Sequence, residues 1–456
     1  MRIAYVAAGA AGMYCGSCLH DNALVTALQR QGHDAVLVPT YTPLRTDLPD
    51  VSHGRIFYGA LNVYLEQMGA VFRHLPGLLA WLLDRPGLIR RAARLGAATD
   101  PTELGALTYS ILQGEEGFQA RELKKLVTWL RDDFRPDVVH LTNSMFAGFA
   151  RELKRELGVP VVCSLQGEDL FLDQIREPWR TRVREMLRER ARDVDVFQVN
   201  SAWYAGFMAE YLGGIDRGRL LVVPLGLDLT GHGVKPPPRA PEEPFTIGYL
   251  ARICPEKGLH LLAEAFHLLA TSGREGAPSP ASRGRDGEGA RVRLRVAGYL
   301  GARDEAYLRD LEARIAERGL ALCYERVGEV DREEKLRFLQ SLDVLAVPTV
   351  YREPKGLFVL EALANGVPVV QPRHGAFPEM LEATGGGLLV EPDSAEDLAR
   401  GLATLLHDPA LRRELGERGR TAVQTRFTAD VEAAATVAGY ERLLRLPGKK
   451  GAAPAH

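Results

Sequence analysis

Two glutamates stand eight positions apart in the segment Glu353-Pro-Lys-Gly-Leu-Phe-Val-Leu-Glu361. Pro354 and Gly356 predict that the first glutamate lies in a loop and that a helix follows over residues 356–365. The first amides of a helix have no partner within it, so this end is expected to attract phosphate. Glu361 can accept both hydroxyls of a ribose, and Glu353 can accept hydroxyls of a sugar nearby.

Two cations flank a second predicted turn, in Tyr249-Leu-Ala-Arg-Ile-Cys-Pro-Glu-Lys-Gly258. The pattern predicts a strand that ends and gives way to a helix, with Arg252 and Lys257 beside the turn. Such cations can hold a diphosphate that gains negative charge when a sugar leaves it. Together with the paired glutamates in the same predicted sheet, they predict a nucleotide-sugar site.

Apolar strand patterns alternate with amphipathic helix patterns along the chain, which is typical of parallel sheets covered on both faces. We predict an α/β fold of two doubly wound, Rossmann-like domains facing a central cleft, because ligands of open sheets bind beyond the strands' carboxyl ends. The predicted strands cover residues 2–7, 35–38, 137–141, 161–165, 196–200, 220–223, 245–250, 292–297, 321–324, 344–348, 368–371 and 388–390.

The predicted domains follow from this alternation and from a proline-rich linker at residues 235–244. Two domains are expected over 1–225 and 226–427, followed by a closing helix over 428–447 and a tail over 448–456. Residues 271–290 have the composition of a disordered surface loop.

Residues 57–117 exceed what one strand–helix unit needs and predict a helical insertion, which we expect to line the acceptor side of the cleft. Its leucines and Trp81 precede Arg85, Arg90, Arg91 and Arg94, so a peripheral membrane contact is a second hypothesis for this segment. No apolar run of about 18 residues exists, so no membrane span is predicted.

Composition narrows the function classes. The formal net charge of the 456 residues is -2, which gives no reason to expect nucleic acid as a partner. Five cysteines cannot all pair, and we expect a reducing, cytoplasmic compartment. Cys15 and Cys18 have redox or metal spacing without a second ligand pair, so a tight glycine loop is the favoured interpretation.

At these motifs the sequence resembles retaining glycosyltransferase family 4, of the GT-B fold. Its E-x7-E motif matches Glu353 and Glu361, and its "GRL…KG" turn matches residues 251–253 and 257–258. The stretch after Glu361 resembles "EAxAxGxPVV…GG.pE", with Ala376 where the family has a second glycine. In the first domain, Gly16 resembles the glycine of the family's donor-binding loop, and the loop also resembles that of starch and glycogen synthases.

The resemblance implies transfer of a sugar from a nucleotide-diphosphate-sugar to an acceptor, with retention of configuration (EC class 2.4). It implies that the domain over 1–225 binds the acceptor, that the domain over 226–427 binds the donor, and that the helix over 428–447 crosses back to the first domain. It implies that Glu353, with the amides of Lys355, Gly356 and Leu357, holds the sugar ring, and that the Val330 backbone contacts the base. Because Arg252 and Lys257 already serve the diphosphate, no metal or other cofactor is predicted. Asp193 and Asp195 have a DxD form but are interpreted as surface and strand-capping residues.

One family position departs from the pattern in a way that touches catalysis. The family carries a histidine in an "xHG" context, where this chain has Ser164-Leu-Gln-Gly, with Gln166 in the histidine's place. An amide can still donate and accept hydrogen bonds, so Gln166 is predicted to contact the donor sugar. His140, one strand earlier, is predicted to lie in the same cleft; a core or capping histidine is the alternative.

Three other functions were weighed against transfer. A nucleotide-sugar-binding protein with impaired catalysis is suggested by Gln166. A GT-B epimerase or hydrolase is disfavoured by the joined Arg–Lys turn and E-x7-E motif. A dinucleotide-dependent dehydrogenase is disfavoured because Gly9, Gly12 and Gly16 do not have G-x-G-x-x-G spacing. The donor base, the sugar and the acceptor are left open by the sequence.

Overall fold

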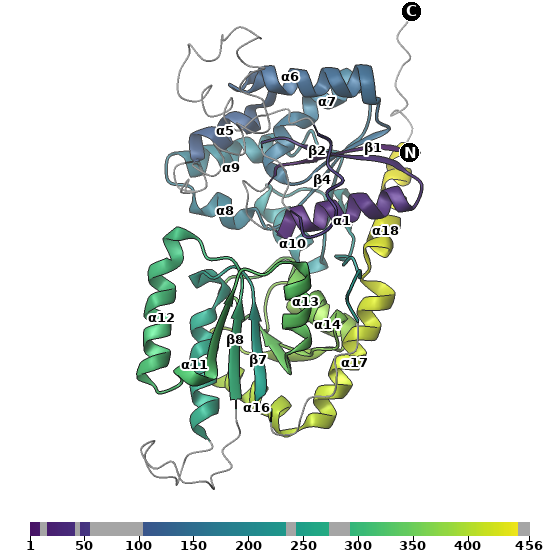
Figure 1. The fold of residues 1–456 in the computed structure, drawn as a ribbon. Helices are drawn as coiled ribbons and strands as arrows, with labels where there is room; N and C mark the ends of the chain where they lie inside the picture. The colour runs from purple at the N-terminus through teal and green to yellow at the C-terminus, as the bar shows by residue number, and fades with distance from the viewer. Residues whose placement is uncertain (10–15, 42–45, 55–103, 234–242, 273–291, 446–456) are drawn as a thin grey trace, which may run out of the picture. The chain divides into compact units, whose positions relative to one another are not determined.

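The computed structural model describes residues 1–9, 16–41, 46–54, 104–233, 243–272 and 292–445 (Figure 1). Several predicted features therefore lie wholly or mainly outside the described residues. They are Cys15, most of the insertion at 57–117 with its arginines, most of the linker at 235–244, the loop at 271–290 and the tail at 448–456.

The described chain folds into two compact units. Unit 1 comprises Met1–Gly226 together with Ala429–His456, and unit 2 comprises Leu227–Thr428. Within the described residues, each unit contains one six-stranded sheet in which every pairing is parallel. The prediction of two doubly wound, parallel-sheet α/β domains is confirmed.

The sheet of unit 1 has the strand order β2-β1-β3-β4-β5-β6. Its strands are mostly short apolar runs, as expected for strands covered on both faces. They are β1 (Arg2–Ala7), β2 (Asp34–Pro39), β3 (Val138–Leu141), β4 (Val161–Ser164), β5 (Val196–Val199) and β6 (Leu220–Val222). The order reverses direction between β1 and β3, and ligands of such sheets bind at that switch point.

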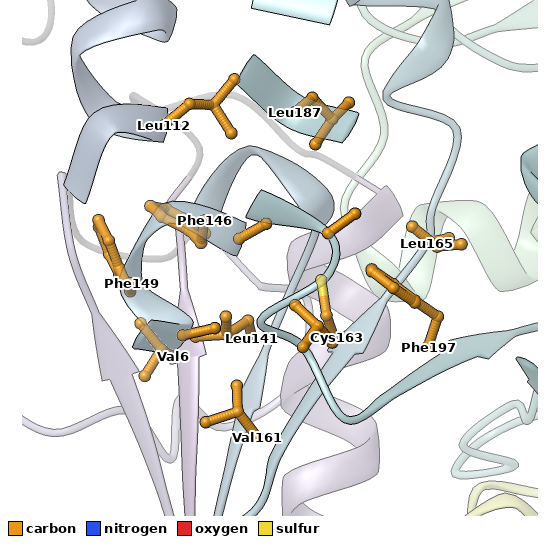
Figure 2. Close-up of a cluster of buried hydrophobic side chains, with 14 of the residues drawn as sticks. Val6, Leu112, Leu141, Phe146, Phe149, Val161, Cys163, Leu165, Leu187 and Phe197 are labelled. Atoms are coloured by element: carbon orange, nitrogen blue, oxygen red, sulfur yellow. The ribbon is translucent and has the colours of Figure 1, made fainter. Parts of the chain in front are cut away.

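Alternate residues of β1 enter two separate cores, one on each face of the sheet. Ala4 and Val6 belong to a core built with α5 (Gly105–Gln113), a short 3-10 helix at Ser144–Phe149 and α9 (Trp179–Arg190). Figure 2 shows Leu112, Phe146, Phe149 and Leu187 of these helices above Val6, Leu141 and Val161 of the strands. Among the described residues, the other α-helices of that unit are α1 (Gly16–Arg30), α6 (Ala120–Trp129), α7 (Ala150–Leu157), α8 (Asp169–Gln174), α10 (Ala202–Tyr211) and α18 (Ala429–Leu444).

The opposite core joins the two ends of the chain within unit 1. Ile3 and Tyr5 of β1 pack with Leu24 and Leu28 of α1 and with Tyr440 of α18. This packing explains why the last helix belongs to the first unit: its apolar stripe covers a sheet face that α1 alone leaves open.

The sheet of unit 2 has the order β12-β11-β10-β7-β8-β9, so its switch point lies between β7 and β10. Its strands are β7 (Phe245–Leu250), β8 (Val292–Ala297), β9 (Tyr324–Gly328), β10 (Val344–Ala346), β11 (Val369–Pro372) and β12 (Gly387–Val390). Its helices are α11 (Leu259–Ser272), α12 (Glu305–Glu317), α13 (Arg332–Gln340), α14 (Leu357–Ala364), α15 (Phe377–Thr384), α16 (Ala395–His407) and α17 (Pro409–Arg426).

One strand prediction is wrong. A strand was predicted over residues 321–324, but residues 321–323 form a 3-10 turn, and the strand itself runs over Tyr324–Gly328. The apolar run was misleading because it does not enter the core: Leu322 is 87% exposed. Within the described residues, β9 lies at the edge of its sheet, beside β8. An edge strand needs no continuous apolar sequence. Within the described residues, no helix is long and apolar enough to cross a bilayer.

Candidate active site

In unit 2, the turn after β7 lies directly against the segment that follows β10. Gly258 ends this turn with φ +71°, and a Cβ at that position would lie 1.7 Å from the carbonyl oxygen of Pro348. Only glycine therefore allows the two backbones to approach so closely. The approach brings Lys257, just before Gly258, to the loop that carries Glu353.

Lys257 and Glu353 form a largely buried ion pair, with 2.6 Å between Nζ and Oε2. The hydroxyl of Tyr351 bonds to both of these atoms. The ammonium group also lies 5.0 Å from the Tyr351 ring centre and 5.5 Å from that of Phe358, so aromatic faces support the cation. The structure thus brings together two residues that the sequence predicted separately, and it adds Tyr351.

The other carboxylate oxygen of Glu353 accepts hydrogen bonds from the backbone N–H groups of Lys355 and Gly356, each at 3.2 Å. Burial disfavours the charged form, but the charge and hydrogen bond of Lys257, with the hydrogen bonds of Tyr351 and Gly356, outweigh it. Together they lower the pKa of Glu353 to about 2. Two of the three amides predicted to hold a sugar ring are thus directed at Glu353 here. Leu357 begins α14 and is partly exposed.

The second glutamate of the motif has a cation of its own. Glu361 lies on the buried face of α14, and its Oε1 lies 2.6 Å from Nζ of Lys335 on α13. Asp331 is the N-cap of α13 and forms a capping box with Glu334. The Asp331 side chain accepts from the Glu334 N–H, and the Glu334 side chain accepts from the Asp331 N–H.

The two remaining donor-site predictions of unit 2 occupy loop positions. Arg252 follows β7 with an exposed side chain, and its carbonyl oxygen accepts a hydrogen bond from the Tyr249 hydroxyl at 3.1 Å. Val330 is partly exposed, between β9 and the cap of α13. The Ala376 departure leaves the fold intact, because its backbone is right-handed (φ -81°) and its N–H still bonds to the Glu353 carbonyl oxygen at 2.8 Å.

In unit 1, the predicted site residue Gln166 follows β4 and is 8% exposed. Its amide nitrogen lies 3.0 Å from Oδ1 of Asp21, and 2.8 and 3.0 Å from the carbonyl and hydroxyl oxygens of Thr142. Thr142 directly follows β3, beside the switch point of this sheet. Gly16 begins α1 and is exposed, and a Cβ there would meet open space.

His140 is completely buried, as the core alternative predicted. One ring nitrogen bonds to the Tyr440 hydroxyl, and the other lies 2.7 Å from the Ser164 hydroxyl. Its ring also lies 4.5 Å from that of Tyr5, between centres. Burial lowers the pKa of His140 to about 3, so the ring is neutral at physiological pH. These contacts favour a positioning role for His140 over a contact with substrate.

The two acids of the DxD sequence, Asp193 and Asp195, lie before β5, at the amino ends of the strands. Asp195 accepts a hydrogen bond from the Val161 N–H at 2.8 Å and pairs with Lys154 at 3.0 Å. Asp193 pairs with Arg151 at 3.1 Å. Among the residues that the structure describes, no cluster of three or more potential metal ligands occurs.

Sequence reasoning missed Tyr351, Lys335, Asp21, Thr142 and His20. For two of them a signal was present: a charged residue at helical spacing from apolar residues. Asp21 precedes Leu24 and Leu28 by three and seven positions, and Lys335 precedes Phe338 and Leu339 by three and four. A charge placed there must be paired, which marks it as a candidate for a specific role.

Comparison with known proteins agrees with this geometry. The family model described as "Glycosyl transferase 4-like domain" matches residues 22–226, and the one described as "Glycosyl transferases group 1" matches residues 234–422. Each half of the chain thus matches a glycosyltransferase family, and the architecture is the GT-B fold.

The curated relatives are named as glycosyltransferases. The chain is 26% identical to 2-deoxystreptamine glucosyltransferase of Streptomyces kanamyceticus, over 67% of this chain and 77% of that protein. It is 30% identical to D-inositol 3-phosphate glycosyltransferase of Arthrobacter sp. strain FB24, over 62% and 65%. Its match to MMP alpha-(1->4)-mannosyltransferase of Mycolicibacterium hassiacum, at 35% identity, spans only 32% of that protein.

Solved structures support the fold. Sucrose-phosphate synthase from Thermosynechococcus elongatus has a TM-score of 0.66 at 18% identity, with 97% of this chain and 98% of that one covered. HepE of Anabaena, in complex with UDP, has a TM-score of 0.63 at 16% identity, with 97% and 100% covered.

Proposed function

We propose that this protein is a retaining glycosyltransferase of family 4 that moves a sugar from a nucleotide-diphosphate-sugar to an acceptor. The observation that carries the proposal is the pair of buried ion pairs in unit 2, Lys257–Glu353 and Lys335–Glu361, beside the switch point of a GT-B donor domain. Burying charged groups is costly, and buried charges gather at functional sites. A ligand rich in phosphate and hydroxyl groups can bond to the cation and to the carboxylate of each pair.

Each ion pair binds a different part of the donor. Lys257, with Arg252, binds the diphosphate, where negative charge grows as the glycosidic bond breaks. Glu353 accepts hydroxyl hydrogens of the sugar, while the amides of α14 approach the phosphate side. Glu361 accepts the ribose hydroxyls, and Lys335 keeps that carboxylate charged and oriented beside an anionic ligand.

Donor binding then involves an exchange of partners at Lys257. Its ammonium group lies 2.6 Å from Oε2 of Glu353. A diphosphate carries more negative charge than one carboxylate and competes for the same ammonium, while Tyr351 holds the lysine in place. Glu353 is thereby freed to bind the sugar.

The chemical step requires no protein nucleophile. The acceptor hydroxyl attacks the anomeric carbon on the face that the diphosphate leaves. The carbon–oxygen bond to the phosphate breaks, and the leaving phosphate oxygen takes the hydroxyl proton. Lys257 and Arg252 supply the positive charge that this step needs, so we propose a metal-independent reaction. Cys18, Cys163, Cys254 and Cys323 are free thiols, which fits the proposed cytoplasmic location.

The glutamine at position 166 suggests one rival function, which is to bind nucleotide sugars without turning them over. Thermal-shift screening with UDP-glucose, GDP-mannose and ADP-glucose identifies the donor, because a ligand at 100 times its dissociation constant adds about 2.7 kcal/mol of stability. Release of free nucleotide from that donor then separates the two functions. Stabilisation with release supports the transferase, whereas stabilisation without any release, with or without added acceptors, would establish the binding protein.

A further inference from the structure

The loop that follows β11 packs directly against the backbone of Glu353. The N–H of Ala376 donates to the Glu353 carbonyl oxygen at 2.8 Å. Gly375, just before Ala376, has φ +61°, and a Cβ there would lie 2.5 Å from that carbonyl oxygen and 2.7 Å from the Glu353 nitrogen. Any side chain would clash at this position, so the loop is built to hold the backbone that carries the first glutamate of the motif.

His374, in the same loop, holds the chain four residues before Glu353. Its ring nitrogen Nε2 lies 2.9 Å from the carbonyl oxygen of Thr349. A carbonyl oxygen can only accept a hydrogen bond, so Nε2 must carry the hydrogen. The loop after β11 therefore holds residues 349–353, which we call the Glu353 segment, at both ends, through the side chain of His374 and the backbone of Ala376.

The Glu353 segment carries both hydrogen-bond partners of the Lys257 ammonium group, the hydroxyl of Tyr351 and the carboxylate of Glu353. Within the segment, the N–H of Val350 donates to the carbonyl oxygen of Glu256 at 3.0 Å, which ties it to the turn that carries the lysine. A shift at the start of the segment would therefore move the two groups that hold the ammonium group.

The surroundings of the His374 ring indicate that it serves through this one hydrogen bond. Among the residues that the structure describes, its buried nitrogen Nδ1 has no hydrogen-bond partner. The ring also packs beside that of Phe377, with 6.1 Å between centres. A leucine would fill such a place without leaving a buried acceptor unsatisfied, so apolar packing alone does not explain an imidazole here.

We propose that His374 is a positioning residue, which keeps Tyr351 and Glu353 in place around the ammonium group that acts on the diphosphate. It acts on the donor only through these groups, by way of the backbone of Thr349. The proposal rests on the proposed transferase function and adds to it a residue outside the motifs identified in the sequence. All of these residues belong to unit 2.

The test compares His374→Leu, His374→Asn and His374→Gln in nucleotide release from the best donor of the thermal-shift panel. The side-chain nitrogen of glutamine lies as many bonds from Cβ as Nε2 of histidine does, whereas that of asparagine falls one bond short. We expect His374→Leu and His374→Asn to lower kcat about tenfold and to keep the affinity for the free nucleotide within about twofold of the parent. His374→Gln should recover most of the kcat.

His260→Leu is the matched control, because it removes a half-buried histidine of the same unit whose Nδ1 lies 3.0 Å from the Tyr307 hydroxyl. This variant should keep the kcat of the parent. If His374→Leu does not fold, the comparison of His374→Asn with His374→Gln decides the question, because both replacements are polar.

Nuclear magnetic resonance of isotope-labelled histidine tests the hydrogen bond without any substrate, with the His374 signals assigned by their loss from His374→Gln. We expect the neutral ring to carry its hydrogen on Nε2, and a hydrogen on Nδ1 instead would overturn the inference. An unchanged kcat in His374→Leu and His374→Asn would also overturn it, as would equal losses in all three variants. A parent protein that releases nucleotide from none of the donors would instead overturn the proposed function, and this positioning role with it.

Discussion

The buried histidine of α1 makes stability depend on pH in a way that can be worked out from its contacts. His20 lies between two carboxylates: Nε2 is 2.7 Å from Oε1 of Glu432, and Nδ1 is 3.4 Å from Oδ1 of Asp21. Burial disfavours the charged ring, but the charges and hydrogen bonds of both acids outweigh it. They raise the pKa of His20 from 6.5 to about 9. The other oxygen of Glu432 accepts from the N–H of Gly226, the last residue before unit 2.

A pKa raised on folding stabilises the protein only while the group is protonated. The contribution is fully present below pH 6.5, where the ring is charged in both states, and is lost as pH rises through 9. At about 1.36 kcal/mol per pH unit, the shift amounts to about 3 kcal/mol. For a unit of this size, that corresponds to a fall in melting temperature of about 6–12 °C over this range.

His20→Gln is the perturbation that isolates this contribution. It leaves Asp21 and Glu432 without their shared cation, so we expect a lower melting temperature at pH 6.5 and a smaller decline towards pH 9 than in the parent. Calorimetric scans at several pH values measure the difference, with His407→Gln, an exposed histidine at the end of α16, as the control. Parallel pH curves for the parent and His20→Gln would refute the charged-histidine account.

The remaining predictions concern the two ion pairs of unit 2. Glu361→Ala should weaken nucleotide binding by about 1.5–3 kcal/mol with a smaller effect on kcat, because the ribose does not change during the reaction; calorimetric titration of the free nucleotide measures this, and unchanged affinity would remove the ribose assignment. Lys335→Met should mimic that loss, with recovery in Lys335→Arg, whereas a variant that binds as the parent does would show the pair to be structural. Tyr351→Phe removes the hydroxyl between Lys257 and Glu353 and should lower kcat by about tenfold or less, measured by nucleotide release; an unchanged kcat would show that the hydroxyl does not position the lysine.

The sequence predicts much of this architecture because the strands are apolar runs separated by helices whose periodicity is clear. The strand prediction failed at residues 321–323 for a physical reason. An edge strand such as β9 is polar, and the apolar residues before it belong to a turn. Likewise, the crossing back of α18 was expected only from family resemblance, whereas its packing against α1 depends on Tyr440 and Leu443 contacting residues more than 400 positions away.

For the site, the sequence identifies residue types and local turns but not long-range partners. Lys257 and Glu353 were both predicted, yet their direct pairing depends on the approach of Gly258 to Pro348, which no local pattern encodes. His140 was placed in the cleft because it lies at the end of a strand. It is instead enclosed by Tyr440 from the far end of the chain. A parallel sheet brings such residues together only after its strand order is known.

Steady-state release of nucleotide by the parent and by Lys257→Ala tests the central claim most directly, with binding of the free nucleotide measured on the same preparations. The account predicts that Lys257→Ala loses most of its kcat, by about a hundredfold or more, and less of its nucleotide affinity, because the ammonium group acts where charge develops. Normal turnover by Lys257→Ala would contradict the proposed transferase mechanism.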